Sequence, residues 1–141
     1  MMTSRKQFIS TLFAVAALAA GSSLAWAAKA GETRLRAQLT GPAIGTVKPS
    51  GEAQFRASAG RSKLEIEVEH VNLAAATLLT VWSQRGATPP VQIGSITLGG
   101  APEHEGELEL NTQDGQTVPA LQAGDVITVR NGAQAILSGT L

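Results

Sequence analysis

The chain has 141 residues, no cysteine, and eleven basic against eleven acidic side chains. Without thiols it cannot form disulfides, thiolate zinc sites, blue-copper sites, iron–sulfur clusters or cysteine-ligated haem, and it has no cysteine to carry a lipid. Beyond residue 27 only Phe55 and Trp82 are aromatic. This composition argues against a base-stacking or sugar-binding platform, and no basic run indicates nucleic-acid binding.

The first 27 residues have the organisation of a secretory signal peptide. Positions 5–6 are basic, positions 8–20 are apolar apart from two hydroxyl residues, and Ala25 and Ala27 occupy the small-residue positions of an A-x-A cleavage site. The apolar stretch is shorter than the roughly 20 residues of a transmembrane helix. We therefore expect cleavage after Ala27, and residues 28–141 form the predicted domain, periplasmic or secreted and without a membrane span.

Two export routes fit this N-terminus. Residues 4–9, SRKQFI, resemble the twin-arginine signal, with Lys6 in the place of its second arginine. An ordinary Sec signal explains the same residues, so both routes remain open. Twin-arginine export often carries proteins with a bound cofactor. We expect no cofactor here, because residues 28–141 contain no cysteine, no methionine and only two histidines.

The expected mature chain alternates apolar and polar residues almost throughout, the pattern of β-strands with one face in a core. The clearest case is KLEIEVE, residues 63–69, and Gly-, Pro- and Asn-rich turns separate successive runs. Strands are predicted at residues 33–40, 52–58, 63–69, 78–84, 91–98, 106–110, 125–130 and 135–141. About eight short antiparallel strands predict a β-sandwich or a Greek-key barrel.

Two hairpins give specific registers. A four-residue AGRS loop is predicted to close the second and third strands, which would place Phe55 opposite Ile66 in the core. In the same register Arg56 lies opposite Glu65 on the outer face, as an exposed ion pair. The dipeptide Asn131-Gly132 predicts a tight turn between the last two strands.

Several segments together resemble the chordin-type (CHRD) domain: LRAQLTG (35–41), PSGEAQF (49–55), LEIEVEHVNL (64–73) and GDVITVRNGAQAILSGTL (124–141). That family opens with a similar A-x-L-x-G strand, continues with G-x-A-x-F, and closes with a final G-x-L. The resemblance covers most of the predicted domain and implies an exported Greek-key sandwich. The family's His-x-His segment is missing, since LLTVWSQ (78–84) stands in its place, so no function of those histidines is implied.

The densest group of ionisable residues is PEHEGELEL, residues 102–110, which contains Glu103, His104, Glu105, Glu107 and Glu109. Carboxylates and an imidazole can bind metals, so one alternative is a divalent-cation-binding module that uses residues 103–109. Neighbouring residues of a strand face opposite sides, which argues against one shared site. The sequence predicts a loop up to Glu105 and then a strand whose glutamates face solvent. His104 and Glu105 remain the pair to mutate.

Other candidate residues have structural explanations. By strand parity His70 is expected on the inner face, where a lone histidine is packed rather than catalytic. Trp82 shares a face with Leu78 and forms either a second core layer, which we favour, or an exposed anchor for a partner. The segment NTQDG (111–115) predicts a turn, because its spacing does not match a calcium loop.

The sequence therefore predicts an exported, non-catalytic β-sandwich domain with a binding or structural role in the cell envelope. Its partner would be another envelope or extracellular protein, contacted through an edge strand or the loops at residues 41–51 and 85–90, and self-association is a further alternative. No catalytic, cofactor-binding or metal-binding residue is assigned. The alternatives are the cation-binding module and a small hydrolase with converging carboxylates, although no nucleophile motif is present.

Overall fold

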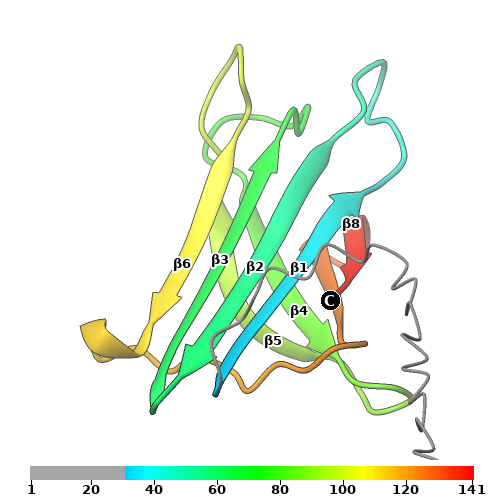
Figure 1. Cartoon of the computed structure of the whole chain (residues 1–141). Coiled ribbons are helices and arrows are strands. Elements are labelled where there is room, and N and C mark those ends of the chain that lie inside the picture. Colours follow the sequence, from blue (N-terminus) through cyan, green and yellow to red (C-terminus); the bar gives the residue numbers. More distant parts are fainter. Residues whose placement is uncertain (1–30) are drawn as a thin grey trace, which may run out of the picture.

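The computed structural model describes residues 31–141, which form a single curled antiparallel sheet (Figure 1). The elements of this part of the chain are β1 (Glu32–Thr40), β2 (Ser50–Ser58), β3 (Arg61–Glu69), β4 (Leu78–Gln84), β5 (Val91–Thr97), β6 (Gly106–Asn111), the 3-10 helix η1 (Thr112–Asp114), β7 (Val126–Asn131) and β8 (Gln134–Thr140). Each of the eight predicted segments forms one strand, so the all-β prediction is confirmed. The predicted signal peptide and the expected start of the domain lie outside the described residues. No helix in residues 31–141 is long and apolar enough to cross a membrane.

The two edge strands, β5 and β6, lie next to each other, so that the sheet nearly closes into a barrel. The strand order is β5-β4-β7-β8-β1-β2-β3-β6, and Figure 1 places β6, β3, β2 and β1 in front of β4 and β5. At the seam the Gly99 amide donates a hydrogen bond to the Glu105 carbonyl (2.8 Å), and Leu108 packs over Gly94. Across this seam β7, β4, β5 and β6 follow the Greek-key order.

Inward-facing residues of the strands fill the barrel, as the alternating pattern predicts. Burial of this apolar surface is the main force that holds the fold together. The buried hydrophobic residues are Ala37, Leu39, Ala53, Phe55, Leu64, Ile66, Val68, Val71, Leu79, Val81, Ile96, Leu98, Leu121, Ile127, Val129, Ile136 and Leu137. The Leu108 and Leu110 side chains of β6 pack against this core while staying partly exposed.

The register predicted for the β2–β3 hairpin is wrong by two residues. The turn is Ala59-Gly60 alone, with φ angles of 44° and 78°, and this two-residue geometry matches the twist of the flanking strands. Phe55 therefore lies opposite Leu64, and Arg56 lies opposite Lys63. Because the shift is an even number of residues, every side chain keeps its predicted face. The predicted pair of Arg56 with an acidic residue is replaced by two opposed cations.

The hairpin predicted between the last two strands is confirmed, with its turn one residue later than expected. Asn131 pairs with Gln134, and Gly132-Ala133 forms the turn, with a φ of 60° at the glycine. A register shift between Val129 and Arg130 adds an extra residue to β8. This bulge lets the consecutive residues Ile136 and Leu137 both be buried.

An ion pair between exposed Arg85 and buried Asp125 lies where β4 ends and β7 begins. The Asp125 side chain, 3% exposed, accepts hydrogen bonds from Arg85 Nε (2.9 Å), Arg85 Nη2 (2.8 Å) and the Gln122 amide (2.8 Å). The hydrogen bonds from Arg85 lower the pKa of Asp125 more than its burial raises it. Arg85 also donates to the Ala120 carbonyl (2.9 Å). The pair thus ties the segment after β4 to the loop before β7.

Candidate functional site: the charged outer face of the sheet

Charge is concentrated on the outer face of β1, β2, β3 and β6. In residues 31–141 this face holds five of the eight Lys and Arg residues and seven of the eleven Asp and Glu residues. By contrast, Arg130 is the one charged residue in the described strands β4, β5, β7 and β8. The two outer faces of the barrel therefore differ strongly in chemistry, and the charged one is the candidate binding surface.

The charges on this face form rows that run across the strands. An acidic row joins Glu52, Glu67 and Glu107, which lie directly opposite one another on β2, β3 and β6. A basic row joins Arg34, Arg56 and Lys63 on β1, β2 and β3. The two rows are four positions apart along each strand, a distance of about 13 Å at roughly 3.3 Å per residue. The face is consequently acidic toward one end of the strands and basic toward the other.

Glu52 is the neutralised member of the acidic row. Its carboxylate forms an ion pair with Arg36 and accepts hydrogen bonds from the side-chain amides of Gln38 (3.0 Å) and Gln54. The Arg36 hydrogen bond lowers the pKa of Glu52, and the two amides add to this effect. Glu52 is thus held as a carboxylate by partners on β1 and on its own strand.

Glu67, at the centre of the row, has no cationic partner among the described residues. Partial desolvation raises the pKa of Glu67, and repulsion from the carboxylates of Glu107 and Glu65 raises it further. In the basic row, Lys63 Nζ lies 3.4 Å from carboxylate oxygens of both Glu65 and Glu109, so that lysine is shared by two other acids. The negative charge of Glu67 and Glu107 is therefore left for solvent or a ligand to balance.

Three of these side chains bring oxygen atoms close together. One carboxylate oxygen from each of Glu65, Glu67 and Glu107 lies within 4.8 Å of the others. Oxygen donors at such spacing suit hard divalent cations, although calcium takes six to eight ligands and prefers more donors than three carboxylates from a flat surface supply. These residues are the ones in the described chain that could hold a metal ion.

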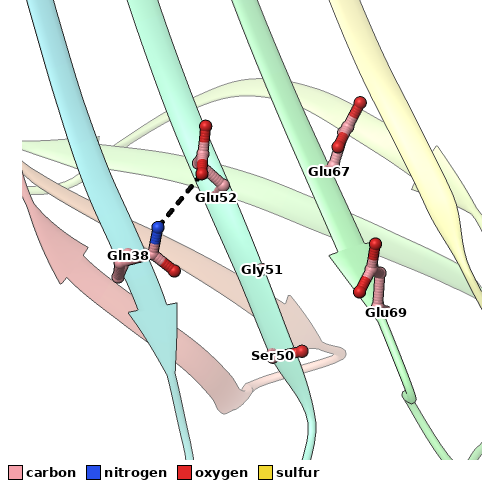
Figure 2. A pocket seen from close by; sticks show the side chains of 6 residues that line it. All are labelled: Gln38, Ser50, Gly51, Glu52, Glu67 and Glu69. Atoms are coloured by element: carbon pink, nitrogen blue, oxygen red, sulfur yellow. Dashed lines mark hydrogen bonds between the residues drawn. The ribbon is translucent and has the colours of Figure 1, made fainter.

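An open pocket of about 150 Å³ lies beside the acidic row, where β3 ends and β2 begins. Figure 2 shows the residues that line it, which are Gln38, Ser50, Gly51, Glu52, Glu67 and Glu69. The lining combines three carboxylates with an amide and a hydroxyl, and Glu67 belongs both to the pocket and to the oxygen cluster. Such a lining favours a positively charged group that can also donate hydrogen bonds.

The structure divides the 102–110 segment as predicted. Glu107 and Glu109 are exposed on the strand, and Glu103 and Glu105 are exposed in the preceding loop. The loop binds the chain after β3 through its backbone, since the Glu103 carbonyl accepts a hydrogen bond from the His70 amide (3.1 Å). The segment does not converge on one site: only Glu107 joins the oxygen cluster, and it does so with residues of β3.

The backbone segments that carry His70 and His104 lie close together, but the two side chains do not both face the core. His70 is exposed and has a φ of 56°, so the prediction that it lies on the inner face is wrong. The left-handed residue ends the strand alternation on which that prediction depended. His104, with a φ of 43°, is half-buried, and its Nδ1 is buried without a hydrogen-bond partner within residues 31–141. Neither histidine lines the acidic pocket.

Trp82 lies on the outer face of β4, on the same side as Leu78, as parity predicts. The favoured interpretation as a second core layer is wrong, because Trp82 is half-buried and Leu78 is 58% exposed. The Arg130 guanidinium covers the indole at 4.5 Å from the ring centroid, and indole Nε1 donates a hydrogen bond to Thr80 Oγ1 (2.8 Å). The tryptophan therefore packs against polar neighbours outside the barrel.

The 111–115 segment forms the predicted turn. Asn111 caps η1, because its side-chain oxygen accepts a hydrogen bond from the Gln113 amide (3.0 Å), and Gly115 ends the turn with a φ of 76°. The oxygen that a calcium loop would use is thus engaged in capping.

The acidic row was not found by sequence reasoning. The stripe of Glu65, Glu67 and Glu69 was visible in the alternation, but its neighbours depend on two strand pairings. The two-residue error in the β2–β3 register would have placed Glu52 opposite Glu69 instead of Glu67. A two-residue turn at Ala59-Gly60 was the signal that could have corrected it.

Comparisons with models of known protein families, with curated proteins and with solved structures find no match for this chain.

Proposed function

We propose that this chain is an exported, non-catalytic binding domain of the cell envelope whose acidic row binds cationic groups of a periplasmic or extracellular partner. The observation that carries the proposal is the position of Glu67, which has carboxylates opposite it on both neighbouring strands and no cation beside it within residues 31–141. Like charges directly opposite each other destabilise a sheet. A cationic group placed over Glu67 would relieve this repulsion, so binding and folding are linked.

The pocket beside the row supports the same conclusion. An ammonium or guanidinium group needs several acceptors at once, and the carboxylates of Glu67 and Glu69 supply them, because Glu52 is already engaged by Arg36, Gln38 and Gln54. Charge-assisted hydrogen bonds to carboxylates are stronger than those between neutral groups. The ligand class is therefore a lysine- or arginine-bearing segment of a partner protein.

Titration calorimetry with a short lysine- and arginine-containing peptide at low ionic strength tests this function. The Glu67→Gln and Glu107→Gln variants should each weaken binding at least several-fold. The Asp114→Asn variant removes an exposed charge in η1, away from the row, and should bind like the unchanged protein. Equal affinity in all four proteins would exclude the acidic row as the binding surface.

Export is the second part of the proposal, and its support is the signal-peptide pattern of the first 27 residues. Mass spectrometry of the protein purified from the envelope or the medium should find a chain that begins at Ala28. A protein that keeps its first residues and stays in the cytoplasm would contradict this part and leave the binding surface untouched.

A divalent-cation-binding module is the second candidate, because oxygens of Glu65, Glu67 and Glu107 lie within 4.8 Å of one another. This cluster uses Glu107 of the 103–109 segment but not His104 or Glu105. Calorimetric titration with calcium and with zinc tests it. A saturable heat that Glu67→Gln abolishes, and that alanine at positions 104 and 105 leaves unchanged, would establish this candidate.

A further inference from the structure

We infer that one cationic partner of the acidic row is the basic row of a second copy of this chain, so that the charged face forms an antiparallel, twofold-symmetric dimer. The inference rests on the proposed function and names a partner for the same surface. Its basis is that acidic and basic rows stand on one face, on the same strands, at a fixed separation.

The register makes the face complementary to itself. The twofold axis lies in the plane of the interface, perpendicular to the strands and midway between the two rows. It places each strand antiparallel over the same strand of the second copy. Lys63 then lies over Glu67 of the second copy, and Arg56 lies over Glu52 of the second copy. Symmetry forms each contact twice, which gives four ion pairs and supplies Glu67 with a cation that the described residues of its own chain do not provide.

Charge selects this arrangement over the alternative face-to-face one. If the axis ran along the strands, the basic row would lie over the basic row, and like charges would repel. In the antiparallel arrangement the row midway between the acidic and basic rows lies on the axis, so Arg36, Glu65 and Glu109 each lie over their own copy. These three like-charge contacts oppose association, but the four ion pairs outnumber them. Arg36 and Glu65 already have partners of opposite charge within their own chain.

The dimensions of the face set the strength of this dimer. Strands β1, β2 and β3 have nine residues each and β6 has six. At about 4.8 Å between strands and about 3.3 Å per residue they cover on the order of 500 Å². Stable interfaces bury about 800 Å² per partner, and this face is charged rather than apolar. The association is therefore weak and controlled by ionic strength, because exposed charges are screened beyond about 10 Å at 0.1 M salt.

Sedimentation equilibrium on the protein, purified as its host processes it, tests the dimer. The dissociation constant should rise at least tenfold between 20 mM and 500 mM sodium chloride. Lys63→Glu and Glu67→Lys should each weaken self-association at least tenfold, since each variant places like charges over each other. An equimolar mixture of these two variants restores both contacts in a heterodimer and should associate as tightly as the unchanged protein.

The Lys48→Glu variant is the matched control, because it makes the same charge change in the exposed loop between β1 and β2. If Lys63→Glu does not fold, Arg56→Glu replaces it, since Arg56 has no ion pair within residues 31–141 and its reversal should also weaken association tenfold. Failure of the two complementary variants to associate when mixed, with both folded, would overturn the dimer. So would a wild-type protein that stays monomeric at 20 mM salt.

The cationic peptide separates this inference from the proposed function. A monomeric protein that still binds the peptide through Glu67 would refute the dimer alone. A protein that neither associates nor binds the peptide would refute both proposals. If both hold, the peptide should compete with self-association and shift the equilibrium toward the monomer.

Discussion

Glu67 of β3 lies directly opposite Glu107 of β6 on the outer face of the barrel, and Glu52 lies opposite Glu67 on the other side. Glu52 is neutralised by Arg36, whereas Glu67 and Glu107 have no such partner among the described residues. This part of the sheet is less stable than a mixed-charge row would be. The repulsion that destabilises the free protein is relieved when a cation binds at this site. The stability of the folded protein with and without the cation is therefore a direct measure of the proposed function.

Replacing Glu67 by glutamine should stabilise the folded protein by about 0.5 kcal/mol at neutral pH, because the change removes repulsion from both opposed carboxylates. Urea unfolding followed by circular dichroism measures the difference. The control is Glu109→Gln, which loses the 3.4 Å contact with Lys63 and should be unchanged or slightly less stable. A destabilised Glu67→Gln variant would mean that the carboxylate has a stabilising partner.

The same pair predicts a pH dependence of the stability difference. The pKa of Glu67 is raised in the folded protein, so between the unfolded value of about 4.3 and the folded value the folded state binds more protons. Stability therefore falls as pH rises through this range, and the advantage of Glu67→Gln grows with it. Unfolding of both proteins at closely spaced values from pH 3.5 to 7 should give a difference near zero at the acidic end. A difference independent of pH would contradict the assigned repulsion.

The Arg85–Asp125 pair predicts the opposite dependence on pH. The pKa of Asp125 is lowered by Arg85, so the pair stabilises the fold above the unfolded pKa of about 3.9 and loses this effect as pH falls through the folded pKa.

Asp125→Ala should cost about 2 kcal/mol at pH 7, because the buried position loses three hydrogen bonds. Asp114→Ala, at an exposed position, should stay within about 0.5 kcal/mol of the unchanged protein.

Arg85→Met separates the charge effect from the lost hydrogen bonds at Asp125. It leaves the carboxylate buried with the Gln122 amide as its remaining partner, so the pKa of Asp125 should rise. Carbon-detected NMR titration of the aspartates measures this shift directly. An Asp125 resonance that titrates at the same pH in both proteins would show that the guanidinium does not set its ionisation.

The seam of the barrel predicts a coupled pair of substitutions. A Cβ on Gly94 would lie 2.5 Å from Leu108 Cδ2, so Gly94→Ala should push β5 and β6 apart and cost about 1–3 kcal/mol. In a Leu108→Ala background the added methyl group has space, and its cost should be smaller by at least about 1 kcal/mol. A double-mutant cycle by urea unfolding measures the coupling. Gly100→Ala is the control, because its Cβ would meet only ordinary contacts at 3.6 Å.

How far the sequence predicts this fold depends on how far apart in the sequence the interacting residues are. Alternation is a local property, so the strands and the faces of residues such as Ile66 and Glu109 follow from it. Turn geometry is local as well, but choosing two loop residues instead of four at Ala59-Gly60 changes every pair in the β2–β3 hairpin. His70 departs from its predicted face because a single left-handed residue interrupts the alternation.

The Glu67–Glu107 half of the candidate site depends on non-local pairing, which the sequence alone does not predict. Glu67 and Glu107 are forty positions apart, and they become neighbours because β6 returns to β3 after β4 and β5 have formed the back of the barrel. No local pattern encodes that return. Trp82 follows the same rule: parity predicts that it shares a face with Leu78, whereas its cover by Arg130 comes from the pairing of β4 with β7.

Arg130 over Trp82 predicts a spectroscopic change that reports on this outer face. Removing the guanidinium by Arg130→Ala should cost about 0.5–1 kcal/mol and expose the indole to water. Trp82 is the one tryptophan of residues 28–141, so in the processed protein its emission maximum should move to longer wavelength without interference. Arg61→Ala, on the charged face, should leave the emission unchanged. An unshifted spectrum in Arg130→Ala, with the fold intact, would mean that neighbours other than the arginine protect the ring.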